Sequence, residues 1–269
     1  MTRLRVQQAA EFLFESRGLG GAGRDLPERI APVDLEEGYA IQSAAAKLRA
    51  MGTAGYKIGL TSAESQRANG ASAPIAGRLA SADILESPAR IMLPSNHLRI
   101  VEAEFVFEMG RSISMEDLPI GETNIRDYIR VVHAGLEICN SRLSAEDAPL
   151  PCIVADNGNA DLLVIGDPIE NWHTALDSDI PVVLSRRSGR PVHGTSGRVL
   201  GSPINSLVWL ANWLVSRGER LERGDLVASG SCTGMTEVAP EDCVIAVFGL
   251  SSQVSVEFKS VGQLNEVRA

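Results

Sequence analysis

Two glutamates that alternate with apolar residues are the first candidates for chemistry in this chain. Glu102 and Glu104 lie in the stretch VEAEFVFEMG, and on a β-strand residues two positions apart point to the same face. Neighbouring carboxylates repel each other and are costly to bury unless a positive charge lies between them. A divalent cation meets this need, and carboxylate oxygens favour Mg²⁺ or Mn²⁺ over softer metals. A solvent-exposed strand is the alternative, but the neighbouring residues 105–107 are apolar.

A third carboxylate is needed to complete such a site. Glu137 follows an apolar stretch, between Leu136 and Ile138, which is unusual for a surface glutamate. A carboxylate at a helix end that pairs with Arg142 is the alternative. Glu108 has the same parity as Glu102 and is expected to face solvent near the end of its strand.

Lys57 lies in the uncharged stretch YKIGLTS, although a lysine on a solvated face usually has charged neighbours. Two glycine-containing stretches are also candidate pocket walls. VADNGNAD contains Asn157 and Asn159, and ASGSCTGM contains Ser231 among glycines whose backbone N–H groups can bind an anion. Ordinary turns are the alternative for both stretches. The chain has no G-K-[ST] motif, which disfavours nucleotide binding.

Composition narrows the class of protein. The chain has 269 residues, a net charge of −9 and 44% hydrophobic residues, and no basic cluster suggests a nucleic-acid partner. The first residues are interrupted by glutamates and predict neither a signal peptide nor a membrane span. The four cysteines lack metal-ligand spacing and are expected to be free thiols that fill the core or a pocket. No histidine pair has zinc-binding spacing and no G-x-S-x-G motif is present. These features predict a soluble cytoplasmic protein.

The elements that must position these residues differ along the chain. Residues 1–55 are expected to form a helical N-terminal segment, with Asp34 and Glu37 starting its second helix, which ends at about residue 50. Residues 56–269 are expected to form a β-rich catalytic domain, and the fold class is therefore α+β. Strands are predicted over residues 99–109, 162–165, 180–184, 225–229 and 244–248. Helices are predicted over residues 125–137 and from the cap Ser202 to Gly218.

Six motifs in this order give the chain a family resemblance: GYKIGLTS, VEAEFVFEMG, LEICNSRL, VADN, LGSPINSLVWLANWL and GDLVASGSCTG. Together they resemble the hydratase/decarboxylase branch of the fumarylacetoacetate hydrolase superfamily, which includes 2-oxopent-4-enoate hydratases and 4-oxalocrotonate decarboxylases. The resemblance covers about residues 34–258. It implies a mixed β-roll core of the fumarylacetoacetate hydrolase type with a helical N-terminal segment, in homo-oligomeric rings.

The resemblance also assigns roles to residues. It implies that Glu102, Glu104 and Glu137 bind Mg²⁺ or Mn²⁺, and that Lys57 is catalytic and solitary because it faces the pocket. Substrate binding is expected at Leu60, Thr61, Ser62, Asn157, Asn159 and Ser231.

The implied reaction is metal-dependent hydration of a 2-hydroxy-2,4-dienoate (2-oxo-enoate) to a 4-hydroxy-2-oxo acid, in aromatic or steroid ring-cleavage catabolism. The cation would stabilise the enolate of the substrate. A 2-oxo-3-enedioate decarboxylase, a hydrolase of carbon–carbon bonds and a non-catalytic scaffold remain alternatives. The family also implies a complex with a decarboxylase or aldolase of the same pathway.

Two positions depart from the family pattern. Ile75 stands in PIAG where relatives commonly have an acidic residue, and Asn159 lies in a turn that is often serine-rich in the family. Both changes lie where the pocket is expected. They predict a more apolar pocket that accepts a longer substrate tail than the simplest dienoate.

Overall fold

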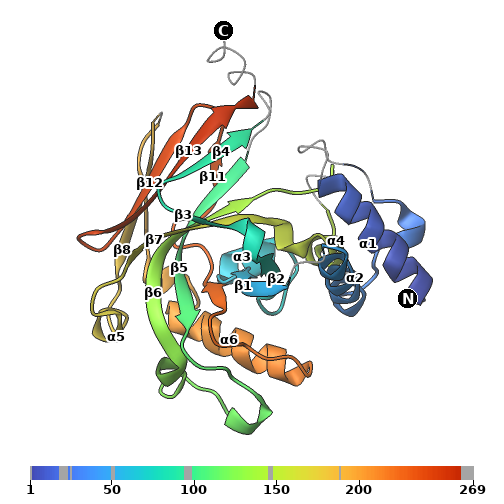
Figure 1. Cartoon of the computed structure of the whole chain (residues 1–269), viewed down its shortest axis with the longest axis horizontal. Helices are drawn as coiled ribbons and strands as arrows, with labels where there is room; N and C mark the ends of the chain where they lie inside the picture. Colours follow the sequence, from blue (N-terminus) through green and yellow to red (C-terminus); the bar gives the residue numbers. More distant parts are fainter. Residues whose placement is uncertain are drawn as a thin grey trace.

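Two β-sheets and a group of N-terminal helices make up the fold (Figure 1). The computed structural model describes residues 2–17, 24, 26–49, 52–93, 99–144, 148–187 and 189–261. The larger sheet has eight strands in this part of the chain. In order they are β2 (Ile75–Ala80), β1 (Thr53–Gly59), β10 (Leu226–Ala228), β5 (Arg99–Met109), β6 (Ile129–Cys139), β7 (Ala160–Pro168) and β3 (Ile84–Glu86), and β11 (Thr236–Val238) also pairs with β5. The sheet is mixed, because β1 runs parallel to β10 and β3 runs parallel to β7.

The smaller sheet packs against the larger one and closes the main core. Its strands, in order, are β4 (Ala89–Leu93), β13 (Ser252–Ser260), β12 (Cys243–Phe248), β8 (Pro181–Arg186) and β9 (Val192–Thr195). Phe105 of the larger sheet meets Phe248 of the smaller sheet edge to face, with ring centroids 5.0 Å apart. Helix α6 (Pro203–Ser216) adds Leu207, Leu210 and other apolar residues to the same core.

The two faces of strand β5 have different surroundings. Val101, Ala103, Phe105 and Phe107 point into the core and are fully buried, as the alternation of side chains on a strand requires. The residues between them, including both glutamates, point to the other face of the sheet. The strand therefore supports the core and the candidate site at once.

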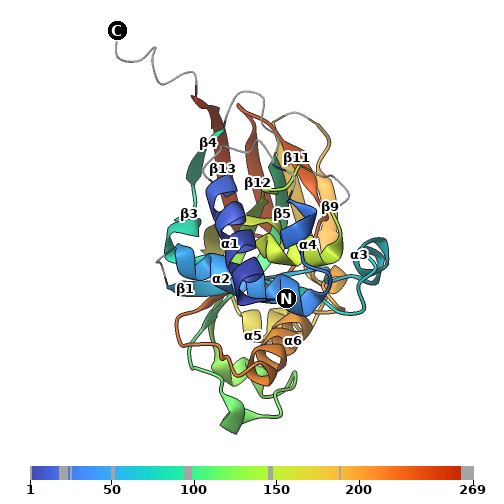
Figure 2. The same cartoon turned by 90° about the vertical axis from the view of Figure 1, so that its right-hand side faces the viewer.

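The two N-terminal helices share a small second apolar core with helix α4 from the middle of the chain. Helices α1 (Arg3–Arg17), α2 (Leu35–Leu48) and α4 (Leu150–Ala155) enclose it, and they lie in front of the larger sheet in Figure 2. The predicted start of α2 is confirmed, because Asp34 Oδ1 accepts a hydrogen bond from the Glu37 N–H at 2.8 Å. The division into domains at residues 55 and 56 stays a prediction.

Several predicted elements are confirmed. The strand predicted over residues 99–109 is β5, and the other four predicted strands overlap β7, β8, β10 and β12. Ser202 caps α6, and its side chain accepts a hydrogen bond from the Ile204 N–H at 3.3 Å. Shorter helical elements are α3 (Ala63–Ala68), α5 (Trp172–Ala175) and the 3₁₀ turns Glu28–Ile30, Ser81–Asp83, Met115–Asp117, Ile125–Tyr128, Asn157–Asn159 and Ser196–Arg198. Within the described residues, no helix combines the length and apolarity needed to cross a membrane.

The helix predicted over residues 125–137 is wrong. Only a 3₁₀ turn, Ile125–Tyr128, forms there, and β6 follows it and pairs with β5 from Met109 to Ile100. Ile129, Val132 and Leu136 fit a helical spacing, but β-branched residues such as Val131 and Val132 also favour strands. Pairing with two long neighbouring strands decides the outcome. The correction matters because it moves Glu137 from a helix end into the sheet.

Candidate active site

The register of three strands brings one lysine and three glutamates together. Glu102 on β5 lies directly opposite Glu137 on β6, and Glu104 lies opposite Gly135. Lys57 comes from β1, beyond β10 in the same sheet. Its Nζ lies 3.3 Å from Glu137 Oε1, and both side chains are almost completely buried. This contact is an ion pair without hydrogen-bond geometry, since Glu137 Oε1 has no hydrogen-bond partner among the described residues.

Glu104 is fixed by the glycine-rich stretch that follows β10. Its Oε2 accepts a hydrogen bond from the Gly230 N–H at 2.8 Å, and the side chain is fully buried. Gly230 has a φ of +106°, and a Cβ there would lie 2.2 Å from Thr61 Oγ1. Only glycine fits this position. The backbone N–H that we expected to bind an anion thus binds a carboxylate of the protein.

The negative charges of this group exceed its positive charge in the part of the chain that the structure describes. Burial, together with the charge of Glu137, raises the pKa of Glu102. The same two causes, with Glu102 added, raise the pKa of Glu104 well above its usual value. Burial lowers the pKa of Lys57, but the nearby carboxylates, Glu137 foremost, outweigh it and hold that pKa above its ordinary value. Three carboxylates face one ammonium, and we call Lys57, Glu102, Glu104 and Glu137 the glutamate cluster.

The glutamate cluster has the chemistry of a divalent-cation site. Glu104 Oε1 and Glu137 Oε1 are buried and have no hydrogen-bond partner in the described part of the chain. Orphaned buried carboxylate oxygens are costly, and oxygen-binding cations such as Mg²⁺ or Mn²⁺ remove that cost. The donors therefore fit such an ion.

Gly77 and Gly158 lie close to the methylene chain of the Lys57 side chain. A Cβ at Gly77 would lie 3.1 Å from the Cγ and Cε atoms of Lys57, and one at Gly158 would lie 3.0 Å from Cε. Gly158 also has a φ of +60°, which disfavours any other residue. Ile75 is buried beside them, because its Cδ1 would be 3.4 Å from a Cβ at Gly158. The side chain of Lys57 is thus confined by two glycines, and the apolar side chain of Ile75 lies beside them.

The predicted substrate-binding residues divide into two groups. Thr61 lies against Gly230, and the Ser231 side chain is close enough to Glu102 to lower the pKa of its carboxyl, so both are part of the site. Asn159 lies beside the end of β6, because its carbonyl accepts from the Asn140 N–H at 2.8 Å. Asn159 Oδ1 is buried and has no hydrogen-bond partner among the described residues. Thr61 and Ser231 therefore adjoin the carboxylates, and Asn159 lies at the end of β6.

The other three predicted binding residues have visible structural roles. Ser62 caps α3 through the Ser65 N–H at 3.1 Å, and Leu60 packs in an apolar cluster that includes Ile75. Asn157 accepts from the Arg78 N–H at 2.7 Å and donates to the Arg78 carbonyl at 2.8 Å, which occupies both ends of its amide. Their binding of a substrate stays a prediction.

Two residues near the site have partners that the sequence did not indicate. Arg142, considered as a partner for Glu137, instead pairs with Asp156 at 2.5 Å. Cys139, expected to be a filler, places its Sγ 3.7 Å from Glu102 Oε2. The signal for Cys139 was its position two residues after Glu137, which on a strand means the same face.

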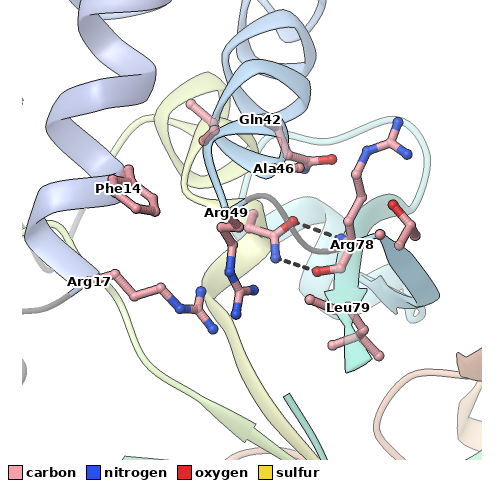
Figure 3. Close-up of a pocket in the computed structure, with 13 residues that line it drawn as sticks. Phe14, Arg17, Gln42, Ala46, Arg49, Arg78 and Leu79 are labelled. Carbon is pink, nitrogen blue, oxygen red and sulfur yellow. Dashed lines mark hydrogen bonds between the residues drawn. The ribbon is translucent and has the colours of Figure 1, made fainter. Parts of the chain in front are cut away.

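The pocket in Figure 3 is a different place in the molecule. It lies between α1, α2 and β2, has a volume of about 50 Å³, and is lined by Arg17, Arg49 and Arg78 among others. Asp83 is held by Arg49 Nη2 at 2.6 Å and by Arg17 at 3.1 Å, while Asp161 lies 3.3 Å from Arg17 and 3.6 Å from Arg99. We call Arg17, Arg49, Arg99, Asp83 and Asp161 the arginine cluster. None of its residues belongs to the glutamate cluster.

Comparison with known proteins defines the class. The chain is 33% identical over 274 residues to the 2-keto-4-pentenoate hydratase of Paraburkholderia xenovorans strain LB400, and both chains are covered completely. It is 32% identical over 189 residues to a 4-oxalocrotonate decarboxylase of a Pseudomonas species, covering 69% of this chain and 71% of the relative. A search against protein-family models gave no match. The chain belongs to the hydratase/decarboxylase branch of the fumarylacetoacetate hydrolase superfamily.

A solved structure confirms the fold. The 4-oxalocrotonate decarboxylase from Pseudomonas putida G7, complexed with magnesium and adipate, aligns with a TM-score of 0.84 at 24% identity over 96% of this chain and 98% of that chain. The predicted fumarylacetoacetate hydrolase-type fold, a curled half-barrel sheet with N-terminal helices, is therefore confirmed.

Proposed function

We propose that this protein is a metal-dependent lyase that adds water to a 2-hydroxy-2,4-dienoate and yields a 4-hydroxy-2-oxo acid. The observation that carries this proposal is the complete-length similarity to 2-keto-4-pentenoate hydratase, together with the glutamate cluster. Aromatic or steroid ring cleavage would supply such a dienoate.

Glu102, Glu104 and Glu137 would hold a Mg²⁺ or Mn²⁺ ion. When bound, this ion supplies positive charge that stabilises the negative charge developing on the 2-oxo oxygen of the substrate. The hydrogen bond from the Gly230 N–H keeps Glu104 oriented, so this carboxylate would need little rearrangement.

Lys57 would carry the proton in the reaction. The substrate loses the proton of its 2-hydroxyl and gains one at the far end of the diene, which gives a conjugated enone. Water then adds its hydroxyl to C4 and its remaining proton to C3. Lys57 is the buried group beside the carboxylates that can both donate and accept a proton. Asn159 Oδ1, which lacks a partner among the described residues, would accept a hydrogen bond from the attacking water.

A 2-oxo-3-enedioate decarboxylase is the second candidate. The Pseudomonas decarboxylase relative favours it. The apolar wall at Ile75 opposes it, since a decarboxylase must accommodate a second carboxylate at the far end of its substrate. A scaffold role is opposed by the buried and unpaired carboxylate oxygens, which a non-catalytic subunit does not need.

The reaction can be tested with a panel of 2-hydroxy-dienoates followed by ultraviolet absorption, with and without Mg²⁺, and with product identification. We expect water addition without CO₂ release, and faster turnover of longer or alkylated dienoates than of 2-hydroxypenta-2,4-dienoate. Ile75→Asp should shift this preference toward the short substrate by about 1–3 kcal/mol. Release of CO₂ from an enedioate as the main reaction would establish the decarboxylase instead.

We further propose a cytoplasmic homo-oligomer that associates with a decarboxylase or aldolase of the same pathway. Family resemblance is the support for this proposal. Light scattering of the purified protein tests the assembly, and a monomer at micromolar concentration would contradict it.

A further inference from the structure

Cys139 places a sulfur atom beside the proposed cation site. Glu137 and Cys139 are two residues apart on β6 and therefore point to the same face of the sheet. One carboxylate oxygen of Glu102, one of Glu137 and Cys139 Sγ all lie within 4.8 Å of one another. The thiol is 3.7 Å from Glu102 Oε2. These three residues thus form a second possible ligand set that shares two glutamates with the first.

The spacing of these atoms suits one ion. With metal–oxygen bonds of about 2.1 Å and metal–sulfur bonds of about 2.3 Å, a tetrahedral ion places its ligands roughly 3.4–3.6 Å apart. The 3.7 Å between Cys139 Sγ and Glu102 Oε2 agrees with this spacing, and no separation within the set exceeds 4.8 Å. Glu137 Oε1 is also buried and lacks a hydrogen-bond partner among the described residues, so a ligand for a cation is independently present.

The identity of the ligands separates two kinds of cation. Mg²⁺ prefers oxygen ligands and gains little from sulfur, whereas Zn²⁺ and Cd²⁺ bind thiolates strongly. We propose that Cys139 is a conditional ligand, which joins Glu102 and Glu137 around a thiophilic cation but remains a thiol beside Glu102 when the ion is Mg²⁺. In the first case the thiol proton is released to solvent. The inference rests on the cation site of the proposed function and adds to it a sensitivity to soft metals.

Cd²⁺ titration of the purified full-length protein tests this inference directly. A Cd²⁺–thiolate bond absorbs in the ultraviolet, and this signal reports sulfur ligation without any assay of activity. We expect the wild-type protein to develop the band at one equivalent of Cd²⁺. Cys139→Ser should lose the band and bind Cd²⁺ more weakly by at least about tenfold, while its Mg²⁺ affinity stays within a factor of about two. Cys243→Ser is the matched control, because Cys243 is a partly buried free cysteine on β12 and should leave the band unchanged.

The outcomes separate this inference from the proposed function. Persistence of the band at one equivalent in Cys139→Ser, or an unchanged Cd²⁺ affinity, would overturn the role of Cys139. Loss of Mg²⁺ binding in Cys139→Ser would also overturn it, since Sγ would then matter for hard ions. If Cys139→Ser does not fold, Cys139→Ala is titrated in its place. Failure of the wild type to bind Mg²⁺, with the Cd²⁺ band intact, would instead contradict the proposed function.

Discussion

The glutamate cluster and the arginine cluster are both buried and charged, yet their charges are arranged in opposite ways. In the arginine cluster, Asp83 is held by two guanidinium groups and also accepts from the Ala80 N–H at 3.1 Å. In the glutamate cluster, three carboxylates share one ammonium, and two of their oxygens lack a hydrogen-bond partner among the described residues. Within the described residues, the carboxylates of the arginine cluster are matched by positive charge and those of the glutamate cluster are not.

The pKa values express this difference. Burial would raise the pKa of Asp83, but hydrogen bonds from Arg49 and the charge of Arg17 lower it below its usual value. For Glu104 burial acts in the same direction, and the neighbouring carboxylates reinforce it. A buried carboxylate with a lowered pKa stabilises the fold, whereas one with a raised pKa costs stability for as long as it stays charged. Burial of charge alone therefore does not identify a functional site, but unmatched burial does.

Removal of the lysine should give the largest effect. Lys57→Met keeps much of the side-chain volume and removes the ammonium, so turnover should fall about 10²–10⁴-fold, the span for a positioned proton-transfer group. Mg²⁺ binding, measured by calorimetry, should remain because the three glutamates are intact. Lys259→Met, on β13, is the control and should keep normal turnover. Near-normal turnover in Lys57→Met would contradict the catalytic role.

Removal of the Asp83 carboxylate, which Arg17 and Arg49 share, should lower stability and leave turnover nearly unchanged. Asp83→Asn leaves Arg17 and Arg49 without their common anion and should lower the free energy of unfolding by about 2–3 kcal/mol. Urea denaturation measures this loss. Turnover per folded molecule should change little, because the arginine cluster contains no residue of the glutamate cluster. A large loss of turnover in a fully folded variant would mean that the two clusters are coupled.

The stability difference between the wild type and Asp83→Asn should depend on pH. The folded pKa of Asp83 lies below its usual value of 3.8, so its stabilisation is complete above that value and is lost as the pH falls through the folded pKa. The difference in unfolding free energy should therefore be constant from about pH 5 to 7 and shrink below about pH 4. A difference that stays constant down to pH 2 would refute the assigned ion pairs.

The smallest effect on the free energy of unfolding is expected for metal-free Glu104→Gln. Whether this free energy rises or falls is the informative result. Without metal at pH 7, the neutral side chain should raise the free energy of unfolding by about 1 kcal/mol, because a buried and unmatched charge is removed. Addition of Mg²⁺ should stabilise the wild type by about 2.7 kcal/mol at a concentration 100 times the Kd, and the variant by much less. Asp83→Asn should keep the full Mg²⁺ increment. A loss of stability in metal-free Glu104→Gln would show that the carboxylate is already satisfied.

Local patterns in the sequence were sufficient for part of this fold. The alternation around Glu102 and Glu104 predicted β5 with the correct bounds, and Ser202 with Pro203 predicted the start of α6. The region of β6 failed because its apolar spacing fits a helix as well as a strand. The partner that selects the strand is β5, whose residues lie roughly 20–40 positions earlier in the chain. A local sequence pattern holds no information about a pairing strand that lies so far away in the chain.

The candidate site was predictable in its residues but not in its geometry. Lys57 and the three glutamates were named from motifs, whereas the pairing of Glu102 with Glu137 depends on the β5–β6 register. The same register brings Cys139 to the site. We expected the amide of Asn157 to bind substrate. In the structure it hydrogen-bonds the backbone of Arg78, which lies 79 residues earlier in the chain, and local sequence does not indicate such a distant partner.

The close approach of Gly77 and Gly158 to Lys57 has a consequence for selectivity. A free lysine side chain samples many rotamers, and fixing it costs about 2 kcal/mol of conformational entropy. Here the fold meets that cost before any substrate arrives, because the two glycine backbones confine the methylene chain. Under the proposed function, the ammonium would therefore deliver or remove a proton at one point in space. Under the proposed function, the carbon of a dienoate that received this proton would depend on how far the molecule reached past Lys57, so the length of the substrate and the position of the new bond would be linked.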